Sequence, residues 1–259
     1  MKALITGASG GIGREIARVL AERGCALILC SRDEAALNAV AAELARVPVR
    51  TIALDLSVEE NCRRLHAMTR DEGVDVLVNN AGFGVFGAFD ETDLDAELNL
   101  IDLNVRAVHV LTKLFLRDFI ARGNAAAPCR ILNVSSMAGF FAGPLFASYY
   151  ASKNYVTRLS EGVAEELRRK RANVTISLLC PGPVPTGFGA RAGVSFGLAG
   201  TPARAVAEAA VRGMLAGRLY VVPGFSNKIL RFLGALFSSR FAARIVYRLQ
   251  SSKTLARRK

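Results

Sequence analysis

The sequence lacks the patterns of metal-binding, disulfide-rich and membrane-spanning proteins. Its two histidines, His66 and His109, do not stand at the spacing of metal ligands, so we expect no metal site. The five cysteines are scattered through mostly apolar segments without a C-x-x-C pair, which is typical of a reduced, cytoplasmic protein whose cysteines serve packing. No apolar run reaches the roughly 18 residues of a membrane-spanning helix. A strand predicted at residues 3–5 leaves no room for a signal peptide ahead of it.

Acidic residues are absent from the last part of the chain. Of the net charge of +12, eleven units come from the lysines and arginines of residues 209–259, so residues 1–208 carry +1 (12 − 11). Residues 223–259 read as two basic amphipathic helices, in which Arg240, Arg244 and Arg248 recur every four residues beside an apolar stripe. Such helices can lie on an anionic membrane surface, here the inner face of the membrane. They could equally cap a binding cleft or form an oligomer contact, and without a binding motif the charge does not predict nucleic-acid binding.

The rest of the chain alternates short apolar strands with helices. We predict strands at residues 3–5, 26–30, 49–54, 74–78, 130–134, 174–179 and 219–222, and helices at 12–23, 33–46, 59–72, 94–122, 149–171 and 201–216. This order is typical of an α/β protein with a parallel sheet covered on both faces. The sequence therefore predicts a single-domain Rossmann fold, a doubly wound sheet of about seven strands over residues 1–222, followed by the helical extension at 223–259.

A glycine-rich turn joins the first predicted strand to the first helix. Gly7, Gly11 and Gly13 stand there in the pattern T-G-x-x-x-G-x-G. Glycines without side chains let the backbone approach a pyrophosphate at the positive end of a helix. The turn therefore predicts a dinucleotide site, and the alternative is an ordinary strand-to-helix turn. Other polar residues (Ser31, Arg32, Asp55, Asn80 and Ser136) also follow strands, at the edge of the sheet where ligands bind.

The end of the second strand bears on the type of cofactor. An acidic residue there would bind the ribose 2′-hydroxyl of NAD, whereas this chain has Ser31 followed by Arg32. A guanidinium can bind a 2′-phosphate through several donors, and no carboxylate is expected there to repel the phosphate. We therefore favour NADP(H), with Arg14 as a further cation; the alternative is that Arg32 is a solvated loop residue.

Tyr149 and Lys153 are four residues apart and share one face of a predicted helix. A nearby ammonium stabilises a phenolate, so we expect the pKa of Tyr149 to lie below its ordinary value. Such a pair predicts a general acid or base. Ser136 precedes Tyr149 by thirteen residues, and Tyr150, three residues before Lys153, is the alternative acid.

Together these motifs resemble the short-chain dehydrogenase/reductase family over about residues 3–190. The resemblance includes the glycine turn, Asp55-Leu56, Asn79-Asn80-Ala81-Gly82, Asn104, Ser136, Tyr149-x-x-x-Lys153 and the segment from Pro181-Gly182 to Thr186. The chain is similar to the branch with DltE-type oxidoreductases and ketoacyl or hydroxysteroid reductases. It departs from the family pattern at Pro185, and at Gly10, where many NADP-dependent members have a basic residue.

The resemblance implies hydride transfer between a nicotinamide and a carbonyl carbon. Tyr149 would exchange the proton, Ser136 would orient the carbonyl oxygen, Lys153 would stabilise the tyrosinate and bind the ribose, and Asn104 would hold a relay water. The cofactor-binding residues it implies are Gly7, Ser9, Gly11, Ile12, Gly13, Ser31, Arg32, Asp55, Leu56, Asn80, Ala81, Gly82, Tyr149, Lys153, Pro181, Gly182, Val184 and Thr186.

The substrate is expected to be a fairly apolar carbonyl compound or alcohol. Candidate pocket residues are Phe140, Phe141, Leu145, Phe146, Phe188 and Phe196, and the loop at 187–200 would shape the pocket. The family resemblance also implies a homodimer or homotetramer. The second hypothesis is a cofactor-binding scaffold or regulator that docks through its basic helices, and the set Asn104, Ser136, Tyr149 and Lys153 argues against it.

Overall fold

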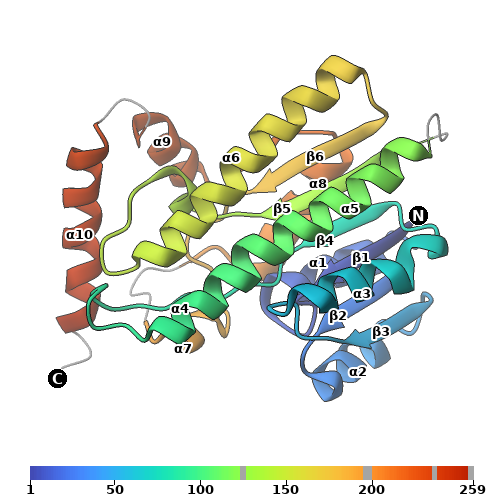
Figure 1. The fold of residues 1–259 in the computed structure, drawn as a ribbon, viewed down its shortest axis with the longest axis horizontal. Coiled ribbons are helices and arrows are strands. Elements are labelled where there is room, and N and C mark those ends of the chain that lie inside the picture. Colours follow the sequence, from blue (N-terminus) through green and yellow to red (C-terminus); the bar gives the residue numbers. More distant parts are fainter. Residues whose placement is uncertain (123–126, 195–199, 235–237, 256–259) are drawn as a thin grey trace.

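Seven parallel strands form one sheet in the computed structural model of the protein, which describes residues 1–122, 127–194, 200–234 and 238–255 (Figure 1). The strands are β1 (Lys2–Thr6), β2 (Ala26–Ser31), β3 (Val49–Ala53), β4 (Val76–Asn79), β5 (Cys129–Val134), β6 (Val174–Leu179) and β7 (Tyr220–Val221). Their order is β3-β2-β1-β4-β5-β6-β7, so the chain moves outward from β1 in one direction and then returns to build the other half. The sequence-based prediction of a doubly wound sheet is confirmed.

Helices cover both faces of this sheet. On one face lie α1 (Gly11–Ala21), α2 (Glu34–Glu43) and α8 (Ala203–Leu215), and on the other lie α3 (Glu59–Thr69), α5 (Val108–Ala121) and α6 (Ala147–Lys170). The strands supply both cores because successive side chains point to opposite faces. In β1, Ala3 and Ile5 belong to the first core and Leu4 to the second. Strands buried on both sides read as continuous apolar runs, which is the pattern in the sequence.

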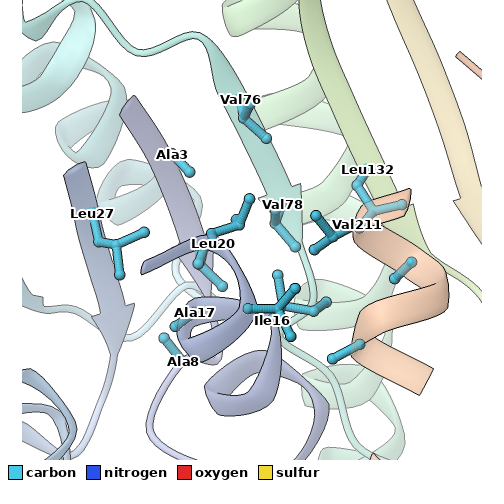
Figure 2. Close-up of a cluster of buried hydrophobic side chains, with 14 of the residues drawn as sticks. Ala3, Ala8, Ile16, Ala17, Leu20, Leu27, Val76, Val78, Leu132 and Val211 are labelled. Atoms are coloured by element: carbon cyan, nitrogen blue, oxygen red, sulfur yellow. The ribbon is translucent and has the colours of Figure 1, made fainter. Parts of the chain in front are cut away.

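Figure 2 shows the first core, where Ile16, Ala17 and Leu20 of α1 point toward the strands and Val211 of α8 packs beside them. All four side chains are fully buried. Burying a side chain the size of Ile16, Leu20 or Val211 contributes on the order of 1.5–3 kcal/mol. This packing fixes α1 against β1, and so fixes the turn between them.

The shorter elements interrupt the predicted helices. The predicted helix at 94–122 consists of α4 (Leu94–Ile101), a π-helical turn η2 (Asp102–Ala107) and α5. Single 3₁₀ turns, η1 (Arg70–Glu72) and η3 (Met137–Phe140), follow α3 and β5. The predicted loop at 187–200 contains a short helix, α7 (Phe188–Ala192), and its residues 195–199 lie outside the described part of the chain.

The basic extension forms two helices, α9 (Phe225–Gly234) and α10 (Ser239–Leu255), at the end of the molecule toward which the strands point (Figure 1). The Arg231 guanidinium attaches α9 to the body, since it lies 3.6 Å from the ring centre of Tyr220 and 5.2 Å from that of Phe140. Within the described residues, no helix combines the length and the apolar character needed to cross a membrane.

Candidate functional site

A cavity of ≈ 800 Å³ opens at the carboxyl edge of the sheet. Its wall combines the glycine turn after β1, the ends of β2 and β3, the segment after β4, the end of β5, the start of α6 and the segment after β6. Of the catalytic and cofactor-binding residues that the family resemblance implies, all but Gly13 and Asn104 line this cavity. The structure thus brings together predicted residues that are up to 179 positions apart in the sequence (Gly7 to Thr186, 186 − 7).

The glycine turn has a backbone that only glycine adopts readily. Gly7 and Gly11 have φ angles of +63° and +55°, in the left-handed region. A Cβ on Gly13 would lie 2.4 Å from the carbonyl oxygen of Gly7, so Gly13 supports the turn from behind instead of lining the cavity. Backbone N–H groups at the start of a helix have no intrahelical partner, and here the start of α1 faces the cavity. This open cradle fits a pyrophosphate.

Hydrogen bonds between β1 and β4 hold the turn in place. The Thr6 hydroxyl accepts from the backbone N–H groups of Asn80 (3.0 Å) and Ala81 (3.1 Å). In return, Nδ2 of Asn80 donates to the carbonyl oxygens of Thr6 (3.0 Å) and Gly7 (3.1 Å). The N-N-A-G segment therefore fixes the backbone of the glycine turn, in addition to lining the cavity.

Arg32 faces Asp55 at the other end of the cavity. Nη1 of Arg32 lies 3.5 Å from Oδ2 of Asp55, and both side chains are partly exposed. Burial raises the pKa of the Asp55 carboxyl, but the hydrogen bonds from Ser57 and the charge of Arg32 outweigh this and lower the pKa below its ordinary value. Arg32 is therefore a cation at the cavity wall that already has a carboxylate neighbour.

Two details of the predicted cofactor site are corrected by the structure. A carboxylate is present near Arg32, because Asp33 also lines the cavity; its Oδ1 accepts from the backbone N–H of Ala36 (2.9 Å) and caps α2. Arg14 is not among the lining residues, since its guanidinium pairs with Glu43 of α2 at 2.5 Å. Arg14 sits one turn into α1, on the side that faces α2.

Buried hydrogen bonds fix α6 and its tyrosine against the sheet. The Ser148 hydroxyl donates to Glu97 of α4 at 2.7 Å, and the Asn133 amide of β5 donates to Ser160 at 2.9 Å. Ser135, at the end of β5, donates to the carbonyl oxygen of Lys153 at 3.0 Å. These contacts hold α6 beside the carboxyl end of β5, where Tyr149 and Lys153 enter the cavity.

Tyr149, Lys153 and Ser136 meet in the cavity wall. Tyr149 is buried against Phe146, with ring centres 4.6 Å apart and nearly stacked, and the Ser136 hydroxyl is close enough to its hydroxyl to lower the pKa of Tyr149. Nζ of Lys153 donates to the carbonyl oxygen of Val134 at 2.9 Å and lies 5.8 Å from the centre of the Tyr149 ring. The predicted grouping of these three residues is therefore present.

The predicted low pKa of Tyr149 is wrong for this arrangement. Burial raises the pKa of Tyr149 to about 12, and the nearby Ser136 hydroxyl only partly offsets the increase. Burial lowers the pKa of Lys153 to about 8, because its ammonium has lost water and faces a carbonyl oxygen instead of a carboxylate. Loss of hydration is thus the largest influence on both pKa values: it raises that of Tyr149 and lowers that of Lys153.

Asn104 lies behind the cavity wall, in the π-helical turn. Its Oδ1 accepts from the backbone N–H of Phe83 (3.1 Å), and its Nδ2 donates to the Phe83 carbonyl (2.9 Å) and to Ser152 (3.1 Å). A Cβ on Gly82 would approach Oδ1 of Asn104 to 2.8 Å and Nζ of Lys153 to 3.5 Å, so only glycine fits there. Asn104 therefore positions the Gly82–Phe83 segment against α6, and its relay function stays a prediction.

Aromatic side chains surround the cavity beside Tyr149. Phe146 and Phe188, both predicted, line it together with Phe83. The predicted residues Phe140, Phe141 and Leu145 do not line it; Phe140 packs on Tyr220 instead, with ring centres 6.2 Å apart. Phe196 lies outside the described residues. One cation, Arg191 of α7, also belongs to this wall.

Gln250 of α10 is a cavity residue that sequence reasoning missed. Its side chain is 5% exposed, and Nε2 donates to the Tyr150 hydroxyl at 3.1 Å, which connects residues one hundred positions apart. A signal was present in the sequence: Gln250 follows Ala243 and Val246 at helical spacing, on the face opposite the arginines. The sequence left three roles open for the basic helices: a membrane contact, a cap on the cleft or an oligomer contact. The structure shows that α10 reaches the cavity through Gln250, as a cap on the cleft would.

The cysteines belong to the core. All five are free and buried, and burial raises the pKa of Cys30, Cys62 and Cys180 to about 12. Thiols of this kind are inert packing residues. Among the described residues, no three His, Cys, Asp or Glu side chains gather as metal ligands would.

Comparison with known proteins connects this geometry to one family. A family model described as short chain dehydrogenase matches residues 1–193. A very-long-chain 3-oxoacyl-CoA reductase from Macaca fascicularis is 34% identical over 175 residues, which cover 65% of this chain and 55% of the relative. The chain spans about half the length of such reductases.

Solved structures match over most of their length. A short-chain dehydrogenase from Sphingobium yanoikuyae in complex with NADPH has a TM-score of 0.81 and 29% identity, covering 90% of this chain and 92% of that one. A short chain dehydrogenase/reductase from Burkholderia phymatum in complex with NAD has a TM-score of 0.81 and 26% identity, with the same coverage. The two neighbours carry different nicotinamide cofactors.

The low pKa of Lys153 predicts how stability depends on pH. Between the folded pKa of about 8 and the ordinary value of 10.5, the unfolded chain binds a proton that the folded chain does not, so stability rises with pH. Relative to Lys153→Met, the unmodified protein should gain about 3 kcal/mol of unfolding free energy across this range, at ~1.4 kcal/mol per pKa unit. Denaturant unfolding at several pH values measures the gain. The exposed Lys113, changed to Met, is the control, and equal pH dependence of the Lys153 variant and the unmodified protein would contradict the assignment.

Proposed function

The chain belongs to the short chain dehydrogenase family, whose members are NAD(P)-dependent oxidoreductases, and we propose that it interconverts a ketone or aldehyde with the corresponding alcohol using NADP(H). One observation carries the proposal. Ser136, Tyr149 and the glycine turn line the same cavity, so a proton donor and a pyrophosphate cradle lie within reach of one bound cofactor and substrate.

The cavity residues fit a dinucleotide along its whole length. Gly7, Ser9, Gly11 and Ile12 would hold the pyrophosphate, supported by Gly13 from behind. Further residues would hold the two nucleoside ends: Ser31, Arg32, Asp55, Leu56, Asn80, Ala81, Gly82, Lys153, Pro181, Gly182, Val184 and Thr186. When bound, the nicotinamide would supply or accept the hydride.

The chain's own residues would handle the proton. With a pKa of about 12, the Tyr149 hydroxyl is protonated at neutral pH and would donate to the carbonyl oxygen as the alcohol forms. Ser136 would hydrogen-bond the same oxygen and orient it. The Lys153 ammonium, largely protonated below its pKa of about 8, would stabilise the tyrosinate, and Asn104 would hold the relay water. In the oxidative direction the same groups would accept the proton.

Replacing the phenol tests the reaction. Tyr149→Phe should lower kcat for ketone reduction by at least about a hundredfold, because a positioned acid contributes on the order of 10²–10⁴ to the rate. Binding of NADPH, followed by fluorescence titration, should stay within about twofold. Tyr155→Phe, on the same helix but directed at His109, is the control and should keep full turnover. Unchanged turnover in Tyr149→Phe would contradict the mechanism; NADPH binding by an unmodified protein that reduces no carbonyl would favour a cofactor-binding scaffold.

The preference for NADP(H) is supported by Arg32. Its guanidinium lines the cavity at the end of β2 and is 56% exposed, so it can turn from Asp55 toward a 2′-phosphate. The competing ion pair is weak, since exposed pairs contribute roughly 0–1 kcal/mol. A charge-assisted contact with a phosphate is stronger.

A substitution at Arg32 tests the cofactor preference. Arg32→Ser should raise the Kd for NADPH at least about tenfold, the loss expected for a charged hydrogen bond, and change the Kd for NADH by less than about twofold. Isothermal titration with both cofactors measures the two values. Arg23→Ser, an exposed change outside the cavity, is the control. Equal weakening of both cofactors would contradict a 2′-phosphate contact.

The proposed substrate is apolar and lipid-like, such as a 3-oxoacyl or steroid-like carbonyl compound. Phe83, Phe146 and Phe188 give the cavity beside Tyr149 an aromatic wall, which suits an apolar substrate. The similarity to very-long-chain 3-oxoacyl-CoA reductases supports the same class. We also propose a homodimer or homotetramer through the helices that carry Asn104 and Tyr149, where Leu98 and Ile101 are exposed.

We further propose that α9 and α10 lie on an anionic membrane surface. Eight of the seventeen exposed large hydrophobic side chains of the described chain belong to residues 225–249, among them Phe225 (78% exposed) and Phe232 (68%). Exposed cations, including Arg240, Arg244 and Arg248, accompany them, and no acidic residue follows Glu208. Apolar side chains mixed with cations suit lipid headgroups and the acyl boundary below them. An attached cleft would then receive a lipid-like substrate from the bilayer.

Charge reversal tests the membrane contact. The triple variant Arg240→Glu, Arg244→Glu, Arg248→Glu should weaken binding to vesicles of phosphatidylglycerol and phosphatidylcholine by about a hundredfold, at ~1 kcal/mol for each arginine. Co-sedimentation measures binding. The control reverses Arg63, Arg64 and Arg70, which are exposed on α3 and the turn after it, away from α10 (Figure 1), and makes the same change in net charge. Equal vesicle binding by both triple variants would contradict the proposal. It would also be contradicted if the unmodified protein were a dimer that only the α10 variant dissociates, because α10 would then form a subunit contact.

A further inference from the structure

Two phenols line the cavity, the buried Tyr149 and the half-buried Tyr150, and the chemistry above uses only Tyr149. Tyr150, next to Tyr149 in the chain, also lines the cavity, where Gln250 of α10 contacts its hydroxyl. We propose that Tyr150 binds the substrate by donating a hydrogen bond to a second oxygen atom, which selects 3-oxo esters and thioesters over simple ketones. This inference rests on the proposed reductase function and deepens it.

The ring of Tyr150 is held in one position. A Cβ on Gly143 would lie 2.1–2.4 Å from its ring atoms, so the ring covers that glycine directly. The ring also meets Tyr149 edge to face, with centres 6.2 Å apart and planes at 78°, and it packs against Phe146 at 6.2 Å. The two hydroxyls therefore have fixed positions in one wall, as a site that reads two groups of one substrate requires.

Gln250 determines how the Tyr150 hydroxyl is oriented. Its amide nitrogen donates to the hydroxyl oxygen at 3.1 Å, so Tyr150 serves as the acceptor in that contact. The O–H proton of Tyr150 must then point elsewhere, and within the described part of the chain no acceptor receives it. Burial raises the pKa of Tyr150, so the hydroxyl keeps its proton at neutral pH. The cavity thus presents a prepared donor beside the reacting tyrosine.

The chemistry of this donor selects the substrate class. A carbonyl oxygen on Tyr149 and Ser136 satisfies the reaction, and a second oxygen a few bonds away would satisfy Tyr150. A 3-oxo ester or thioester carries its second carbonyl at that short spacing, whereas a simple ketone has only one oxygen. A simple ketone would cover the Tyr150 donor without pairing it, and an unpaired buried donor is costly. Discrimination of about tenfold is therefore expected from this one contact.

The test compares two substrates with the same number of heavy atoms, ethyl acetoacetate and 2-octanone, with NADPH and the whole chain of residues 1–259. Tyr150→Phe should lower the ratio of their kcat/KM values, ester over ketone, by about tenfold, mainly through a higher KM for the ester. Gln250→Leu keeps the phenol and should change the ratio less than Tyr150→Phe does. Tyr155→Phe makes the same chemical change outside the cavity and should leave the ratio unaltered.

Other outcomes separate the possible failures. If each variant lowers kcat/KM equally for both substrates, and Tyr150→Phe and Gln250→Leu do so to the same extent, then the Tyr150–Gln250 pair only anchors α10. That result would overturn the inference. An unshifted ratio in a Tyr150→Phe enzyme that still reduces both substrates would overturn it while leaving the proposed function intact. Absence of turnover by the unmodified enzyme, despite NADPH binding, would overturn the proposed function and this inference with it.

Discussion

The hydrogen bonds between the ends of β1 and β4 hold the two halves of the sheet together at the point where the site is built. Thr6 and Asn80 exchange backbone and side-chain contacts there, although they are 74 positions apart. One half of the sheet contributes the glycine turn, Arg32 and Asp55; the other contributes Ser136, Tyr149 and Lys153. Because β1 and β4 are neighbours and parallel, both sets arrive at one edge. A displaced β4 would separate the cradle from the proton donor.

Burial is the second constraint, and it makes the site costly to fold. Lys153 is 5% exposed and has a carbonyl oxygen, not a carboxylate, as its partner. An ammonium held this way loses hydration that a single hydrogen bond does not replace. The Asn133–Ser160 and Glu97–Ser148 contacts compensate locally, since they tie α6 to the sheet and to α4. The burial of Lys153 thus lowers the free energy of unfolding, and the hydrogen bonds of Ser148 and Ser160 along α6 offset that loss.

Sequence reasoning predicted the strands, the order of the helices and most of the cavity wall, because these follow from apolar periodicity and from motifs with fixed spacing. It failed where the answer depends on contacts between distant segments. The pKa of Tyr149 depends on how deeply Phe146 and its neighbours bury it, which the spacing to Lys153 does not reveal. Phe140 and Phe188 are both aromatic residues near the site in the sequence, yet only Phe188 faces the cavity. Gln250 comes from the far end of the chain.

The π-helical turn that carries Asn104 sets a requirement on chain length as well as residue type. A π turn is an α-helix with one residue inserted, and each residue of an α-helix turns it by about 100°. The faces that α4 and α5 present are therefore out of phase by one residue across Asp102–Ala107. Deleting a single residue there would let α4 and α5 merge into one regular helix, and Asn104 would rotate away from Phe83 and Ser152. Loops elsewhere can vary in length, but the extra residue of this π turn is needed because it directs the Asn104 side-chain amide at the Phe83 backbone.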